Sequence, residues 1–129
     1  MIYTNSDGGA RGNPGKAAIG VVIRKGKRII ERYCKGIGVA TNNIAEYKAI
    51  IEALKIAKKY DKEVTCFLDS ELTVKQLNGE YKIKKEHLRR LFEKVKKLER
   101  EFKEVKYKHV KRSDKFQSEA DKLVKRVLN

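Results

Sequence analysis

Several residue types are scarce in this sequence, and their scarcity excludes some classes of protein. There is no tryptophan, and there are only one proline and two cysteines in 129 residues. Two cysteines without a cluster of histidines supply neither a zinc site nor a disulfide framework, so we expect free thiols. No apolar run approaches the roughly 18 residues of a membrane span, and the first residues lack the pattern of a signal peptide. We therefore expect a cytoplasmic protein with no membrane partner.

Acidic residues are also few compared with basic ones. The chain carries 32 lysines and arginines against 17 aspartates and glutamates, a formal net charge of +15. The surplus is uneven, because residues 81–129 hold 18 basic and 8 acidic groups. This surplus of positive charge favours a polyanionic partner, and nucleic acid is favoured over an anionic membrane. The alternative is a surface rich in lysine and glutamate, as in proteins of thermophiles. Only five residues are aspartate, so the position of each is informative.

The spacing of apolar residues predicts one α/β domain over residues 1–129. Strands are expected at 2–6, 17–24, 28–35, 64–68 and 105–110, and helices at 42–60, 70–77, 88–102 and 117–128. Between the first two strands, the glycine-rich residues 8–15 predict a tight loop with several turns. The order βββ-α-β-α-α-β-α predicts a mixed five-stranded sheet flanked by helices.

Four carboxylates lie at the expected ends of these elements. Asp7 follows the first strand, Asp69 ends the fourth, and Glu46 and Asp121 lie near the starts of the first and last helices. Each has a purely structural alternative. Asp7 could begin a turn, Glu46 could form a capping box with Asn43, and Asp69 and Asp121 could stabilise helix starts. Taken singly, these structural roles are the more common ones.

Taken together, the four carboxylates indicate a metal site. If the first and fourth strands are neighbours, their carboxyl ends bring Asp7 and Asp69 side by side. Two like charges about 4 Å apart cost about 4 kcal/mol at an effective dielectric constant near 20, so such a cleft requires cations. Oxygen ligands suit Mg²⁺ or Mn²⁺, and two such ions about 3.5–4 Å apart make a phosphoryl-transfer site. An acidic cleft in a basic protein is typical of a nuclease.

Four sequence motifs resemble those of type 1 ribonuclease H. They are DGGARGNPG, TNNIAE, LDS and SEADKLV, and they follow the family's order over nearly the whole chain. The resemblance implies a ribonuclease H-like fold that hydrolyses the RNA strand of RNA–DNA hybrids with two Mg²⁺ or Mn²⁺ ions, leaving 5′-phosphate and 3′-hydroxyl ends. It implies that the four carboxylates bind the ions. Asp7 would bridge both, Asp121 would lie on the side of the nucleophilic water, and Glu46 and Asp69 would lie on the other.

The resemblance also implies a surface that binds the hybrid. Asparagine side chains both donate and accept hydrogen bonds, so they can recognise a ribose 2′-hydroxyl. The expected contacts in the first loop and at the start of the first helix are Ala10, Gly12, Asn13, Thr41, Asn42 and Asn43. Thr41 would contact a DNA phosphate or simply precede the helix cap. The basic insertion of some relatives is absent, so the long basic helix would bind the hybrid instead, through Lys84, Lys85 and Arg89. The alternative is that this basic face is simply solvated.

The loop before Asp121 departs from the family pattern. It lacks the histidine that many members carry, so we expect Arg112 or Lys111 to supply positive charge and His109 upstream to be structural. Two other functions stay open: a non-catalytic module that binds hybrid or RNA, and an integrase-like enzyme that cuts DNA. The sequence leaves open whether duplex RNA is also a substrate, and we expect a monomer.

Overall fold

Three antiparallel strands and two parallel strands form one mixed sheet. In the computed structural model, which describes residues 1–129, the strands are β1 (Ile2–Gly12), β2 (Gly15–Lys25), β3 (Arg28–Ala40), β4 (Glu63–Leu68) and β5 (Glu104–His109). Their spatial order is β3-β2-β1-β4-β5. β2 pairs antiparallel with β1 and β3, whereas β4 runs parallel to β1 and β5. The predicted element order and mixed sheet are confirmed.

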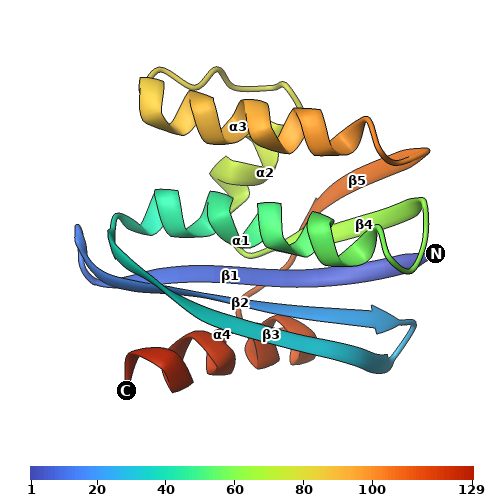
Figure 1. Ribbon diagram of the computed structural model, residues 1–129, viewed down its shortest axis with the longest axis horizontal. Helices are drawn as coiled ribbons and strands as arrows, with labels where there is room; N and C mark the ends of the chain where they lie inside the picture. The colour runs from blue at the N-terminus through green and yellow to red at the C-terminus, as the bar shows by residue number, and fades with distance from the viewer.

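Helices cover both faces of this sheet. They are α1 (Asn42–Ala57), α2 (Glu71–Leu77), α3 (Glu86–Glu99) and α4 (Lys115–Leu128). Figure 1 shows α1 directly on one face with α3 beyond it, and α4 alone on the other face. The chain therefore forms layers, with the sheet between α4 and the remaining helices.

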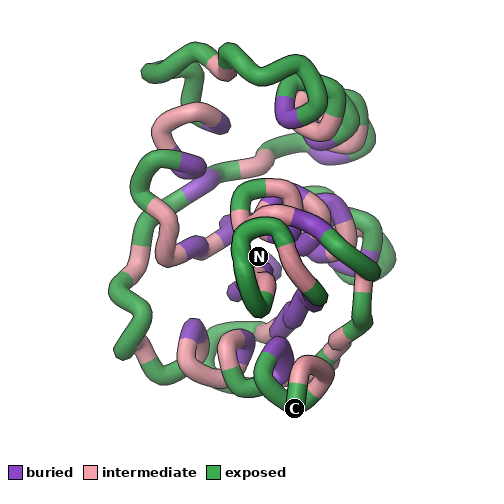
Figure 2. Tube along the Cα trace, turned by 90° about the vertical axis from the view of Figure 1, so that its left-hand side faces the viewer, coloured by how far each residue is buried: buried purple, intermediate pink, exposed green.

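Alternating residues of the central strands are buried on both faces, as a strand between two helical layers requires. Val21 and Ile23 of β2 pack toward α1, while Val22 between them packs against Ala120 and Leu123 of α4. The α1 side holds the larger core, a cluster of 19 buried residues. Figure 2 shows the buried segments lining the interior between helices and strands. None of the helices is long and apolar enough to cross a membrane.

The predicted loop at residues 8–15 is wrong, because this segment is a β-hairpin. β1 continues to Gly12, β2 begins at Gly15, and only Asn13 and Pro14 form the turn. Gly12 is the one glycine of the segment with a left-handed backbone, at a φ of 87°. The other glycines are extended strand residues, so most of the glycine here does not mark chain reversal.

Several predicted helix boundaries are also wrong. α1 ends at Ala57 rather than at residue 60, and α3 ends at Glu99, so Phe102 is buried in the core but lies outside the helix. α4 begins at Lys115, before the predicted start at residue 117. It begins there because the Asp114 carboxylate accepts two backbone N–H hydrogen bonds at 3.0 Å and caps the helix.

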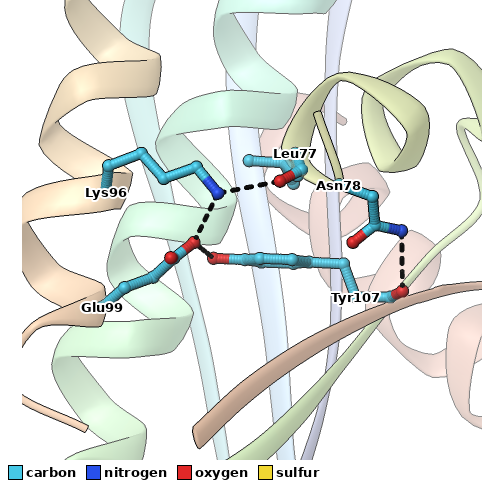
Figure 3. A network of polar contacts seen from close by, with 5 residues as sticks. All are labelled: Leu77, Asn78, Lys96, Glu99 and Tyr107. Atoms are coloured by element: carbon cyan, nitrogen blue, oxygen red, sulfur yellow. Dashed lines mark hydrogen bonds and ion pairs between the residues drawn. The ribbon is translucent and has the colours of Figure 1, made fainter. Parts of the chain in front are cut away.

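A polar network fixes α3 to β5 and to the end of α2 (Figure 3). The Glu99 carboxylate accepts hydrogen bonds from the Tyr107 hydroxyl at 2.5 Å and from the Lys96 ammonium group at 3.1 Å. Lys96 also donates to the Leu77 carbonyl oxygen at 2.8 Å, which satisfies one of the last carbonyls of α2. Burial, reinforced by Glu99, raises the pKa of Tyr107, so its hydroxyl stays a donor at neutral pH. The network thereby holds α2 against the sheet.

Candidate active site

Two of the expected site residues occupy matching positions on neighbouring parallel strands. The β1–β4 ladder ends at the pair Asn5 and Phe67, and Asp7 and Asp69 each lie two residues further along the chain. Both carboxylates therefore come from the same edge of the β1–β4 pair, as expected for neighbouring strands. Asp7 is not at a strand end, however, because β1 continues past it and Asp7 pairs with Gly20 of β2.

Two glycines beside Asp7 allow two helices to approach the sheet closely, α1 on one face and α4 on the other. A Cβ atom on Gly8 would lie 2.3 Å from a backbone carbonyl group of α1 and 2.6 Å from the backbone nitrogen of Glu46. A Cβ atom on Gly20 would lie 2.5 Å from a backbone oxygen of α4. Only glycine permits backbones to come so close. These contacts bring Glu46 on α1 and Asp121 on α4 toward Asp7 from opposite faces.

Glu46 projects from α1 and is held by the start of α2. Its carboxylate accepts a hydrogen bond from the Thr73 hydroxyl at 2.9 Å, and the hydroxyls of Thr73 and Ser70 also lie 2.9 Å apart. Ser70 is the N-cap of α2, accepting from the backbone N–H of Thr73 at 3.3 Å. Asp69 therefore does not cap this helix, and its carboxylate is left for other partners.

The remaining structural alternatives for these acids are also wrong. Thr41, not Asn43, is the N-cap of α1, with its hydroxyl accepting a backbone N–H of the first turn at 3.2 Å. Glu46 consequently forms no capping box. Asp114 caps α4, and Asp121 lies about two turns further on, beyond the positive end of the helix.

A buried amide connects the helix that carries Asp121 to the strand that carries Asp7. Gln117 lies one turn before Asp121 and is fully buried. Its Nε2 donates to the Ser6 carbonyl oxygen at 2.8 Å, and its Oε1 accepts from Asn5 Nδ2 at 3.2 Å. These hydrogen bonds are shielded from water, so they fix the position of α4 on the sheet. Gln117 was not predicted as a site residue, although a spacing of four residues places it on the same helix face as Asp121.

The pKa of Asp7 reflects an acidic cleft. Burial, followed by the charges of Asp69 and Asp121, raises the pKa of Asp7 from 3.8 to about 7, and the Arg112 guanidinium opposes the rise. Three carboxylates therefore lie near enough to one another to interact electrostatically. This cluster of negative charge lies in a protein with a net charge of +15.

Two basic side chains partly neutralise the cleft. Arg112 Nε lies 3.4 Å from Asp69 Oδ2, and Lys125 Nζ lies 3.0 Å from Asp121 Oδ2. The two basic side chains are 79% and 66% exposed, so water screens both ion pairs and makes them weak. Burial raises the pKa of Glu46, while its hydrogen bonds from hydroxyl groups limit that rise.

The loop between β5 and α4 brings one of its two candidate basic residues to the cleft. Arg112 reaches Asp69, whereas Lys111 forms no ion pair with a site carboxylate. His109 ends β5 opposite Leu68 and is exposed, so burial does not support the structural role expected for it.

The chemistry of the cleft fits a divalent cation. Its four acids offer only oxygen ligands, and a bound cation would offset the burial and the repulsion from Asp69 and Asp121 that raise the pKa of Asp7. As the side chains stand, no three acidic, histidine or cysteine residues are gathered tightly enough to hold an ion. Asp69 and Asp121 are instead paired with Arg112 and Lys125, so an ion would have to draw them from these partners.

Two asparagine amides join the β1–β2 turn to the start of α1. Asn13 Oδ1 accepts from the backbone N–H of Asn42 at 3.0 Å, and Asn42 Oδ1 accepts from the backbone N–H of Ala10 at 2.9 Å. Each oxygen accepts one hydrogen bond within the protein, and both amide NH₂ groups remain as donors for a ribose hydroxyl. Gly12 lies at the same exposed turn, and Asn43 is exposed in the first turn of α1.

The other three expected substrate contacts lie further away. Lys84 and Lys85 precede α3, Arg89 is in its first turn, and all three are exposed. Lys84 and Arg89 line a hollow of about 590 Å³ together with Tyr81 and Phe92. None of the four carboxylates lines this hollow. The structure therefore does not join these basic residues to the carboxylates in one pocket.

The fold and the acidic cleft together define an α/β domain of the ribonuclease H-like class. The family described as reverse transcriptase-like matches residues 5–127. Ribonuclease HI of Halobacterium salinarum is 36% identical over 130 residues, which cover 99% of this chain and 64% of that protein. The bifunctional protein Rv2228c of Mycobacterium tuberculosis is 35% identical over 115 residues, covering 87% of this chain and 32% of that protein. The chain belongs to the ribonuclease H family, and it spans about one to two thirds of the length of these curated relatives.

Solved structures share the fold. Ribonuclease H1 of Halobacterium salinarum superposes with a TM-score of 0.93 at 36% identity, covering 98% of this chain and 96% of that chain. LC11-RNase H1, crystallised in complex with an RNA/DNA hybrid, gives a TM-score of 0.92 at 36% identity and covers 100% of both chains. The expected ribonuclease H-like fold and the family resemblance are confirmed.

The stability of the metal-free protein is expected to depend on pH through Asp7. Its pKa is higher in the folded than in the unfolded state, so its contribution to stability is lost as the pH rises from about 4 to about 7. Asp7→Asn should therefore match the wild type near pH 4 and be more stable above pH 7, by about 2–4 kcal/mol. Urea denaturation of both proteins with a chelator present measures this difference. A difference that stays constant with pH would contradict the raised pKa.

Proposed function

We propose that this chain is a ribonuclease H that hydrolyses the RNA strand of RNA–DNA hybrids, leaving 5′-phosphate and 3′-hydroxyl ends. The observation that carries the proposal is the convergence of carboxylates from β1, α1, the end of β4 and α4 around Asp7. The relatives support it, because the Halobacterium salinarum protein is named ribonuclease HI and LC11-RNase H1 was crystallised with an RNA/DNA hybrid.

The carboxylates would hold two Mg²⁺ or Mn²⁺ ions. The proposed ligands are Asp7, Glu46, Asp69 and Asp121. When bound, such ions lower the pKa of an attacking water and stabilise the charge that develops on the leaving oxygen. The chain itself supplies position, because α2 holds the Glu46 carboxylate and Gln117 fixes the helix that carries Asp121.

The surface formed by the β1–β2 turn and the start of α1 would bind the hybrid. The amide NH₂ groups of Asn13 and Asn42 would donate to ribose 2′-hydroxyls, which distinguish the RNA strand from DNA. Lys84, Lys85 and Arg89 would contact phosphates and make binding sensitive to salt. One copy of the chain supplies all four carboxylates, so we propose that it acts as a monomer.

Cleavage of an end-labelled hybrid tests this function. We expect the RNA strand to be cut at low salt in the presence of Mg²⁺ or Mn²⁺, and not in the presence of a chelator. Extension of the fragments by a polymerase would identify the expected 3′-hydroxyl ends. Folded protein that leaves the hybrid intact with either ion would refute the proposal.

Substrate comparison separates the alternatives. A non-catalytic module would bind the hybrid in a salt-dependent manner without cutting it, although four carboxylates facing phosphates would only weaken such binding. An integrase-like enzyme would cut duplex DNA. Duplex RNA is included in the same assay to establish whether ribose on both strands is tolerated.

A further inference from the structure

A groove between α1, α3 and β3 carries chemistry that the proposed function does not use. We call it the lysine-rimmed groove, and its volume is about 720 Å³. Its apolar lining is formed by Ile19, Ile37, Ile51, Leu91 and Leu98. Five lysines surround this lining, namely Lys35, Lys48, Lys55, Lys94 and Lys97. The two helices that form its sides lie next to each other in Figure 1.

The rim is positively charged and lacks internal partners. None of the five lysines takes part in any of the ion pairs of the protein. Two glutamates also line the groove, and one of them, Glu101, is already paired with Lys58 at 3.2 Å. An apolar surface surrounded by unpaired ammonium groups attracts a ligand that is both apolar and anionic.

The groove is turned away from the acidic cleft. Three residues of the groove lie on α1, namely Lys48, Ile51 and Lys55, and they follow Glu46 by two, five and nine positions. They therefore lie roughly 140–200° around the helix from Glu46. On the sheet the groove borders the edge strand β3 and, through Ile19, the neighbouring strand β2. A hybrid bound over the carboxylates is therefore not directed into the lysine-rimmed groove.

We propose that the lysine-rimmed groove binds an acidic amphipathic segment of a partner protein. Leucine-like side chains of the segment would cover the apolar lining, and flanking aspartates or glutamates would pair with the lysines. Nucleic acid fits less well, because a phosphate backbone offers nothing apolar to cover the lining of the groove. A second copy of this chain fits less well too, because its surface is dominated by basic residues.

A fluorescent helical peptide tests the chemistry of this groove. The probe carries leucines along one face and glutamates beside them, and two control peptides replace either every leucine with serine or every glutamate with lysine. We expect saturable binding of the first peptide, binding about tenfold weaker or worse for the serine control, and none for the lysine control. Equal binding of the serine control would overturn the proposal, because charge alone would then explain it.

Paired charge reversals test the location. Lys48→Glu with Lys55→Glu alters the groove, and Lys25→Glu with Lys27→Glu makes the same charge change at the β2–β3 turn. Only the groove pair should weaken peptide binding, by about tenfold, with melting temperatures confirming that both proteins are folded. Equal weakening by the two pairs would overturn the proposal.

Hybrid binding and self-association decide between the possible occupants of the groove. We expect the two charge-reversed proteins to bind an RNA–DNA hybrid equally well in the presence of chelator. A larger loss for the groove pair would make the groove a nucleic-acid surface and overturn the proposal. Gel filtration of the wild type should show one chain per particle. A dimer that is lost in the Lys48→Glu, Lys55→Glu protein would overturn the proposal, because a second copy of the chain would then occupy the groove.

Discussion

Replacing Asp7 with asparagine is expected to lower hybrid cleavage by about 1000-fold, which is about 4 kcal/mol of activation free energy, without weakening hybrid binding. Asp7 is the carboxylate whose pKa responds to both Asp69 and Asp121, so it lies centrally in the cleft. Asparagine keeps the size of the side chain but removes the negative charge that would hold a divalent ion. Removing that charge also removes a repulsion toward phosphate, so the hybrid should bind equally well or more tightly.

Asp61→Asn is the matched control for this substitution. Asp61 pairs with the amino group of Met1 at 3.0 Å, at the other end of β1 from the turn. We expect this variant to keep cleavage within about twofold of the wild type, because an exposed pair contributes little. Single-turnover cleavage and fluorescence anisotropy measure rate and binding separately. Normal cleavage by Asp7→Asn would remove Asp7 from the proposed metal site.

Gly8→Ala is expected to destabilise the protein by about 3 kcal/mol and to lower cleavage about tenfold or more at temperatures where it is still folded. The new methyl group would meet the backbone of α1 at 2.3 Å, a contact that no side-chain rotation can relieve. The helix would have to move outward and carry Glu46 away from Asp7. Urea denaturation measures the first effect, and single-turnover cleavage at saturating metal measures the second.

Gly9→Ala separates this steric effect from the loss of glycine as such. A Cβ atom at Gly9 would lie 3.7 Å from Val124 Cγ1, an ordinary van der Waals contact, and its backbone is not left-handed. This variant should stay within about 1 kcal/mol of the wild type, because alanine also restricts the unfolded chain. If both variants lost stability equally, close approach of α1 would not explain the requirement at Gly8.

The arrangement of Asp7 and Asp69 could be predicted from the sequence because it depends on local signals. Each acid follows a segment of strand-forming residues, and neighbouring parallel strands place equivalent positions side by side, although β1 continues past Asp7. Glu46 and Asp121 were also assigned to the correct helices. Their structural alternatives were wrong because Thr41 and Asp114, rather than the site residues, cap those helices.

The supporting residues could not be predicted, because their roles depend on contacts between distant segments. Glycine in a sequence signals a turn as readily as a close approach, so residues 8–15 were wrongly assigned to a loop. Gln117 reads as an ordinary polar helix residue until Asn5 and Ser6 are placed beside it. The lysine-rimmed groove combines residues from four elements, none of which is unusual by itself.

The two hydrogen bonds of Gln117 join residues 112 and 111 positions apart in the chain, which has a consequence for biosynthesis. Translation produces Asp7 before the other three carboxylates, and Asp121 only after all five strands. A chain interrupted before α4 would retain most of its basic residues but would lack Asp121 and the helix that covers one face of the sheet. Val22 would then lose its contacts with Ala120 and Leu123, so the second face of the core and the carboxylate cluster are completed together, when α4 packs onto the sheet.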